Sequence, residues 1–226
     1  MTHQMTMQLM TAKWPEKLWP KHKFKKDYID FFKDINFLSD FNYLYLILKF
    51  YTAPTVYGKK IGTLINLKSM DRNLCNCFME NKVYFENQFN LNSIVLRSSS
   101  DNILVYFYRE KCLSKRLCNK EVANFLMSMD YNTPQNINNS LKLLAEKFKD
   151  LDSCPHEIGI FLGYPLKDVR AFSSCDKCYK YVGYWKCYEN VLVSKCKFFI
   201  YDFFKWIVAK SYLLTKTNSE ILYNKN

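Results

Sequence analysis

The sequence predicts a single domain of the α+β class with a small antiparallel sheet. Residues 93–109 contain two β-rich runs around the turn residues 98–102, as in a hairpin, and YVGYWKCY at residues 181–188 predicts a further strand. The other periodic segments have helical spacing and do not alternate with strands as they would around a parallel sheet. With 226 residues, of which 49% are hydrophobic, the chain is long enough to bury a substantial core.

Three parts are expected along the chain. Residues 1–26 predict a loosely ordered basic arm that ends in KHKFKK, residues 27–215 predict the domain, and residues 216–226 predict a polar tail. The arm fits either a solvated tail or an electrostatic contact with nucleic acid or membrane.

Helices are expected on both sides of the hairpin. Dense apolar spacing over residues 27–51 fits two helices broken near Ser39 and Asp40. A long terminal helix is predicted over about 190–214, and its run FFIYDFFKWIVAK is apolar apart from three charged residues. This helix is predicted to be buried, or alternatively to lie on a membrane surface or a partner. Further helices are predicted within 68–90, near 110–129, over 138–149 and as a short pair over 154–173.

Glycine is scarce and confined to a few places. The chain has 5 glycines, and residues 154–165, CPHEIGIFLGYP, contain two of them together with two prolines. Gly163 is expected to end a short helix, and Pro165 to open a second one. We predict that this segment and the segment YTAPTVYGKKIG at 51–62 come together around one cavity, with backbone geometry set by Gly58, Gly159, Gly163, Pro165 and Gly183.

The candidate ligand site is centred on the start of the first short helix. A helix N-terminus favours an anion, and the residues expected to bind a small anionic or cofactor-like ligand there are His156, Glu157, Tyr164, Lys60, Trp185 and Lys186. His156 is the best candidate for a catalytic base because its ordinary pKa lies near neutrality. In the alternative interpretation, His156 caps the helix and Glu157 complements its dipole. The zinc motif HExxH is absent, because position 160 is Ile.

The cysteines suggest a second hypothesis, a metal or redox protein. Cys175 and Cys178 have CxxC spacing, and the only partner pattern is the CxC of Cys75 and Cys77. The thiol of Cys154, at a helix start, is a candidate for a lowered pKa. The 9 cysteines are an odd number without a framework, so we expect them to be reduced and the protein to be cytoplasmic.

The charge suggests a third hypothesis, a regulatory module that contacts nucleic acid or a protein partner. The net charge is +12, but 28 of the 33 basic residues are Lys. Arg is the side chain suited to reading bases, so sequence-specific binding of nucleic acid is not expected. Neither a secretory signal nor a transmembrane run is visible.

Four segments together resemble an uncharacterised family of anaerobic Gram-positive bacteria, domain of unknown function 3793 (DUF3793). They are PHEIGIFLGYPLKDV (155–169), GYWKCY (183–188), YTAPTVYGKK (51–60) and ILVYFYR (103–109). The resemblance covers roughly residues 40–200 and implies no activity, cofactor or catalytic residue. The chain departs from the family pattern at Cys154, Ala171 and Cys187, which argues against a metal site shared by the family.

Overall fold

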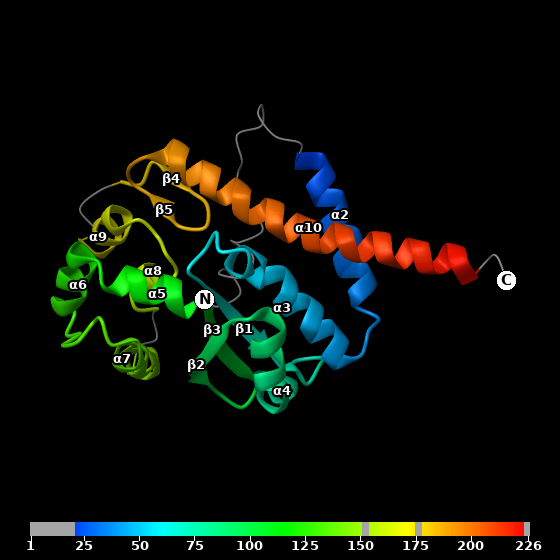
Figure 1. The fold of residues 1–226 in the computed structure, drawn as a ribbon, viewed down its shortest axis with the longest axis horizontal. Helices are drawn as coiled ribbons and strands as arrows, with labels where there is room; N and C mark the ends of the chain where they lie inside the picture. Colours follow the sequence, from blue (N-terminus) through cyan, green and yellow to red (C-terminus); the bar gives the residue numbers. More distant parts are fainter. Residues whose placement is uncertain (1–20, 151–153, 175–177, 224–226) are drawn as a thin grey trace.

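A three-stranded antiparallel sheet lies in the middle of the molecule (Figure 1). The computed structural model describes residues 21–150, 154–174 and 178–223. The central strand is β3 (Asn102–Tyr108), which pairs with β2 (Asn92–Ser98) on one side and with β1 (Gly62–Lys68) on the other. A bulge between Val95 and Arg97 shifts the register of the β2–β3 hairpin. The hairpin expected from the sequence is therefore present.

Helices cover both faces of this sheet and cross its end (Figure 1). In chain order they are α2 (Lys21–Ile35), α3 (Asp40–Val56), α4 (Leu74–Phe89), α5 (Glu110–Leu117), α6 (Lys120–Met127), α7 (Ile137–Asp150), α8 (Ile158–Phe161), α9 (Leu166–Ser174) and α10 (Val191–Tyr223).

Strand β3 joins two hydrophobic cores because successive side chains of a strand point to opposite faces. Its odd-numbered side chains, from Ile103 to Phe107, pack with α3 and α4. Its even-numbered side chains, from Leu104 to Tyr108, pack with α5, α6, α7 and α8. Nearly all of β3 is consequently buried.

Helix α10 forms a third core with α2 and α3. At a rise of 1.5 Å per residue its 33 residues span about 50 Å. The buried side chains of this core are aromatic, branched aliphatic or alanine: Phe31, Ile35, Ile47, Phe50, Ala53, Val208 and Ala209. This helix is thus buried along part of its length, as the sequence predicted.

A short hairpin of β4 (Tyr181–Val182) and β5 (Lys186–Cys187) packs on the first half of α10. A Cβ atom on Gly183 would lie 2.1 Å from the ring of Phe198, so only glycine allows the hairpin to approach the helix this closely. The resulting contact places Trp185 and Tyr184 beside α10.

The fold class is confirmed: the protein is a single α+β domain. The helix break at Ser39 and Asp40 is also confirmed. Strand β1 was not predicted; its short segment becomes a strand by pairing along its whole length with β3. Residues 181–188 form a separate two-stranded sheet, which packs on α10 and does not join the three-stranded sheet.

The two ends of the chain differ from the expected arm and tail. Helix α2 begins at Lys21, and residues 1–20 lie outside the described residues. Helix α10 continues to Tyr223, since the segment contains neither proline nor glycine to end it. Among the helices that the structure describes, none combines the length and apolar character needed to cross a bilayer.

Candidate functional site

The turn between α3 and β1 places Lys60 where three elements meet. The backbone N–H groups of Lys59 and Lys60 both donate to the carbonyl oxygen of Pro54, at 2.8 and 3.0 Å. The side chain of Lys60 then lies against two rings, with Nζ 5.7 Å from the centroid of Tyr184 and 5.9 Å from that of Tyr201. The turn therefore brings a basic group against the β4–β5 hairpin and α10.

Hydrogen bonds connect this hairpin to α10. The Tyr184 hydroxyl donates to Asp202 Oδ1 at 2.7 Å and accepts from Lys205 Nζ at 2.9 Å. Asp202 and Lys205 are three residues apart on α10, so they lie on the same side of the helix. Tyr28 of α2 donates its hydroxyl proton to the backbone carbonyl of Asp202 at 2.7 Å. We name the residues Lys60, Tyr184, Tyr201, Asp202 and Lys205 the junction cluster.

The junction cluster holds two cations against one carboxylate. Burial and, to a smaller extent, the nearby ammonium of Lys205 together lower the pKa of Lys60 to about 7. Burial also lowers the pKa of Lys205 and raises the pKa of Asp202 to about 6, although the two groups attract each other. Among the described residues, the ammonium of Lys60 has neither an acceptor nor an ion-pair partner. Likewise, Asp202 Oδ2 is shielded from solvent without a donor.

Tyr164 and Trp185 lie next to the junction cluster. Their rings stack at 4.7 Å with an interplanar angle of 29°. Trp185 Nε1 donates to Asp168 Oδ2 at 2.8 Å, and the other oxygen of Asp168 accepts the backbone N–H of Tyr188 at 2.9 Å. These bonds fix the orientation of the indole ring. Tyr164 also has a pKa raised by burial and by the neighbouring Tyr201.

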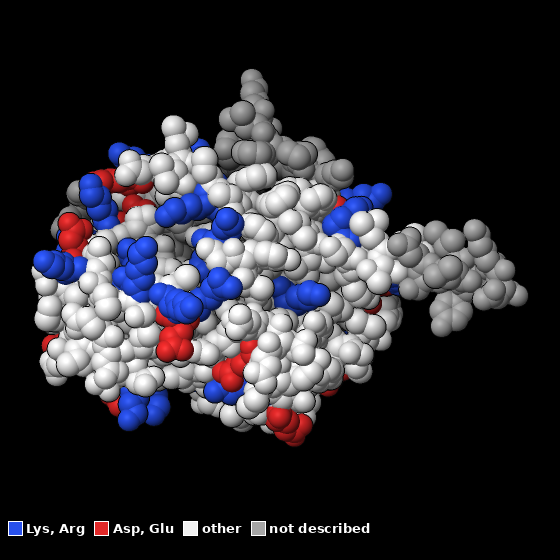
Figure 2. Space-filling model, viewed as in Figure 1, with Lys and Arg blue, Asp and Glu red and all other residues white. Residues whose placement is uncertain are grey.

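A further, partly buried cation contacts the backbone of Tyr164. Arg116 of α5 donates through Nη2 to the backbone carbonyl of Tyr164 at 2.6 Å. Its Nε is buried and has no acceptor among the described residues, and burial lowers the pKa of this guanidinium. Lys and Arg side chains also gather on the face that includes α5 and the β4–β5 hairpin (Figure 2). The surroundings of the junction cluster are therefore electropositive.

Glu157 lies in a different buried group. Its Oε1 is 2.9 Å from Lys147 Nζ of α7 and accepts the hydroxyl of Tyr131 at 3.3 Å. Lys147 also donates to the carbonyl oxygen of Met129 at 2.7 Å. The carboxylate is only 4% exposed, so this pair links two parts of the core. Side chains of the protein itself therefore already occupy the position beside Glu157 where a ligand was expected.

His156 and Lys186 lie at a third place, around the exposed ring of Phe172. The His156 imidazole meets this ring edge-on, with centroids 4.8 Å apart, and Lys186 Nζ lies 5.2 Å from its centroid. Tyr179 is a second ring near Lys186, at 5.3 Å. The structure thus brings Lys60, Tyr164 and Trp185 into one region, and His156 and Lys186 together on the surface.

The two glycine-bearing segments are in contact at Gly163, and the cavity expected between them stays a prediction. This residue has φ of +82° and ends α8, with its N–H bonded to Ile160 and the N–H of Tyr164 bonded to Gly159, the pattern of a Schellman cap. A Cβ at position 163 would lie 3.0 Å from Ile61, the neighbour of Lys60. The second helix expected after Pro165 is present as α9. Gly58 has φ of +68° beside Arg109, and Gly159 packs closely against Val169.

The helix at residues 154–163 is shorter than predicted. A turn at Pro155–Glu157 precedes α8, which has 4 residues, so the expected N-terminal anion site at His156 has no full helix behind it. Cys154 is half-buried, and burial raises the pKa of its thiol to about 11, opposite to the lowered pKa expected for a helix start.

The cysteine motif falls partly outside the described residues, which include Cys178 but not Cys175. Cys178 is exposed, as are Cys118 and Cys196. Within the described ranges, no group of three or more His, Cys, Asp or Glu side chains is arranged to hold a metal ion.

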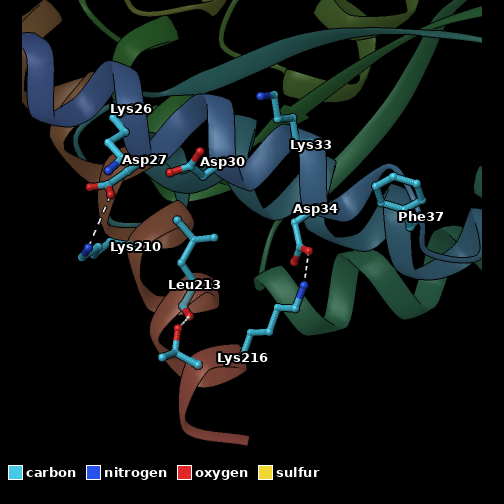
Figure 3. A pocket seen from close by; sticks show the side chains of 10 residues that line it. Lys26, Asp27, Asp30, Lys33, Asp34, Phe37, Lys210, Leu213 and Lys216 are labelled. Atoms are coloured by element: carbon cyan, nitrogen blue, oxygen red, sulfur yellow. Dashed lines mark hydrogen bonds and ion pairs between the residues drawn. The ribbon is translucent and has the colours of Figure 1, made fainter. Parts of the chain in front are cut away.

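A surface groove between α2 and α10 is a further feature (Figure 3). Ion pairs cross it from Asp27 to Lys210, at 3.4 Å, and from Asp34 to Lys216. Asp27 also accepts from Trp206 Nε1 at 2.6 Å. The acidic side chains of the groove therefore form ion pairs and a hydrogen bond between α2 and α10.

Sequence reasoning did not assign Tyr184, Tyr201, Asp202 or Lys205 to the site. The sequence contains a signal for two of these residues, because Asp202 and Lys205 interrupt an otherwise apolar stretch of α10. Charges on the buried side of a helix need partners. Which partner they meet depends on where the β4–β5 hairpin packs, and the sequence does not specify that position.

A protein-family model described as "Protein of unknown function (DUF3793)" matches residues 48–222 of the chain. The matched range contains the whole junction cluster. No curated protein and no solved structure matches the chain.

Proposed function

The chain belongs to the DUF3793 family of proteins of unknown function, and we propose that it binds a small anionic ligand at the junction cluster, through Lys60. The observation that carries this proposal is the ammonium of Lys60, which lies partly buried against two tyrosine rings without a counter-charge among the described residues. A buried charge without a partner is unfavourable, and a bound anion would supply the partner.

The surroundings of Lys60 favour a ligand with a small charged group. Lys205 adds a second positive charge, and its partner Asp202 balances only one of the two. Lys60 itself is half-buried, so a ligand can reach it from the surface. A phosphate or carboxylate group has the charge and size to accept from this ammonium. Tyr164 and Trp185 form the aromatic wall behind the site.

The test compares thermal unfolding with and without inorganic phosphate, against sodium chloride of equal ionic strength. At ten times the dissociation constant, a ligand adds about 1.4 kcal/mol to the free energy of unfolding, which corresponds to a rise in Tm of roughly 2–4 °C for a chain of this size. We expect this rise in the wild type and in Lys59→Met, because Lys59 is the exposed neighbour. In Lys60→Met the rise should disappear.

The affinity for sulfate, which keeps its charge over this range, should also increase as the pH falls through the pKa of Lys60, about 7, because only the ammonium form attracts the anion. An equal rise of Tm in wild type and Lys60→Met would refute the proposed site. Native mass spectrometry of the purified protein would then identify any small molecule that copurifies with it.

We also infer that the protein works in the cytoplasm. The thiols of Cys118, Cys178 and Cys196 are exposed and free. Exposed free thiols are typical of proteins from a reducing compartment. Peptide mass spectrometry of protein alkylated in freshly lysed cells should find all three in the thiol form.

A further inference from the structure

The side chain of Lys60 combines three features that an amine nucleophile needs. The turn holds its backbone by the bond to Pro54, the rings of Tyr184 and Tyr201 shield its amine, and no carboxylate among the described residues pairs with it. An amine paired with a carboxylate would keep its proton and could not react. The arrangement leaves the lone pair of Lys60 free for reaction.

We propose that Lys60 reacts with the carbonyl carbon of a small oxo acid and forms an imine within the junction cluster. The inference rests on the proposed function, because the carboxylate of the oxo acid is the anionic group that the electropositive site holds. The ligand class is thereby narrowed from small anions to those that also carry an aldehyde or ketone group.

The step balances with groups that the protein supplies. The nitrogen lone pair of Lys60 adds to the carbonyl carbon, the new C–N bond forms, and the carbonyl oxygen takes up a proton and becomes a hydroxyl group. Loss of this hydroxyl as water then gives the C=N bond. The ammonium of Lys205 supplies the proton for the carbonyl oxygen, and the carboxylate of Asp202, linked to it through the Tyr184 hydroxyl, takes up the first proton that leaves the amine. Asp202 then returns this proton to the hydroxyl group, which leaves as water, and the neutral amine of Lys205 takes up the second proton from the nitrogen, so that both groups end in their starting forms. No oxidant or reductant is required.

Because of its environment, Lys60 carries a neutral amine in a fraction of the molecules at neutral pH. Burial, followed by the ammonium of Lys205, lowers the pKa of Lys60 to about 7. Among the described residues, the ionisable groups that contact this site or its immediate neighbours include Tyr28 of α2, Tyr51 of α3, Arg109 before α5, Tyr164 before α9, Tyr184 of the hairpin, and Tyr201, Asp202 and Lys205 of α10. Asp202 is the only carboxylate in this set, and it already accepts from Tyr184.

The test uses glyoxylate as the oxo acid, with cyanoborohydride to reduce any imine to a stable secondary amine. Wild-type protein is treated briefly at pH 7, and peptide mass spectrometry compares carboxymethylation at Lys60 and at Lys59. Lys59 is an internal control, because it is exposed and adjacent in the chain. We expect Lys60 to react at least about tenfold faster than Lys59, since an ordinary lysine is almost entirely protonated at this pH. In urea the two rates should become equal.

Two further measurements test the imine: the pH dependence of the reaction rate and the competition by phosphate. The rate at Lys60 should rise with a midpoint near pH 7, the pKa set by its environment, whereas the rate at Lys59 should still be rising at pH 9. Phosphate should slow the reaction at Lys60 and leave Lys59 unchanged. Equal rates of carboxymethylation at Lys60 and Lys59 in the folded protein would refute the proposal that Lys60 forms an imine.

The outcomes separate this inference from the proposed function. If Lys60 shows no selectivity but phosphate still raises the Tm, the anion site stands and the imine is refuted. If Lys60 reacts selectively and phosphate neither slows it nor raises the Tm, the amine chemistry is supported and the anion site is refuted. Lys60→Arg provides a matched variant: it keeps a positive charge, so it should retain the phosphate-dependent rise in Tm, but it cannot form an imine.

Discussion

The molecule buries two groups of ionisable side chains that differ in the balance of their charges. In the first, Glu157 meets Lys147 at 2.9 Å and also accepts from Tyr131. One anion faces one cation, and the remaining hydrogen-bonding capacity of Lys147 is used by a backbone carbonyl. In the second, the junction cluster, the carboxylate of Asp202 interacts with Lys205, the ammonium of Lys60 has no counter-charge among the described residues, and one oxygen of Asp202 has no donor there.

The difference indicates which group is structural and which is available to a ligand. The Glu157 group fills its own hydrogen bonds and connects the segment before α8 to α7, so its role in stability needs no further partner. The junction cluster is unbalanced in a way that reduces the stability of the fold, and such imbalance is typical of functional sites. Variants in the two groups should therefore change stability in opposite directions.

The largest effect is expected from Glu157→Ala. The change leaves the Lys147 ammonium partly buried without its counter-charge and removes an acceptor from Tyr131, so we expect a loss of about 3 kcal/mol in the free energy of unfolding. Urea denaturation monitored by circular dichroism measures it. Glu146→Ala, an exposed neighbour on α7, is the control and should change stability by less than about 0.5 kcal/mol. A loss below about 1 kcal/mol for Glu157→Ala would mean that the pair is not structural.

The second effect is a gain of stability in Lys60→Met that depends on pH. The pKa of Lys60 is lowered on folding, to about 7 from its ordinary value of 10.5. Between these two values Lys60 binds more protons in the unfolded chain than in the folded one, so the contribution of Lys60 to the stability of the wild type rises with pH across this window. Below pH 7 the full cost of burying the ammonium is present. Above pH 10.5 it is absent in both states.

Lys60→Met removes this cost. We expect the variant to be more stable than the wild type by about 2 kcal/mol at pH 6, less than the full pKa shift would give because part of the side chain reaches solvent. The difference should shrink steadily as the pH is raised to 9. Urea denaturation of both proteins at several pH values measures it, and Lys59→Met should show no such trend. A pH-independent difference would show that packing, rather than charge, separates the two proteins.

Only part of the candidate site could be predicted from the sequence. The unusual glycines were informative, since Gly163 does end α8 and does lie against Ile61, beside Lys60. Local patterns of this kind fix backbone geometry over a few residues. The partners of Glu157 and Lys60 depend instead on long-range packing, of α7 in one case and of α10 with its hairpin in the other. No local pattern specifies such contacts, so the adjacent residues His156 and Glu157 were grouped although they face different neighbours.

The smallest effect is expected from His156→Ala, and it tests whether the ligand site is the junction cluster or the surface around Phe172. The imidazole is exposed and its contact is one edge-on ring interaction, 4.8 Å between centroids. We therefore expect a change below about 0.5 kcal/mol in urea denaturation and an unchanged phosphate-dependent rise in Tm. Lys186→Ala removes the cation above the same ring. We expect the same small change in stability and the same unchanged phosphate-dependent rise in Tm for this variant. If either variant abolished the phosphate effect while Lys60→Met retained it, the site would lie around Phe172, as the sequence alone suggested for His156, and the unbalanced charge at Lys60 would need another explanation.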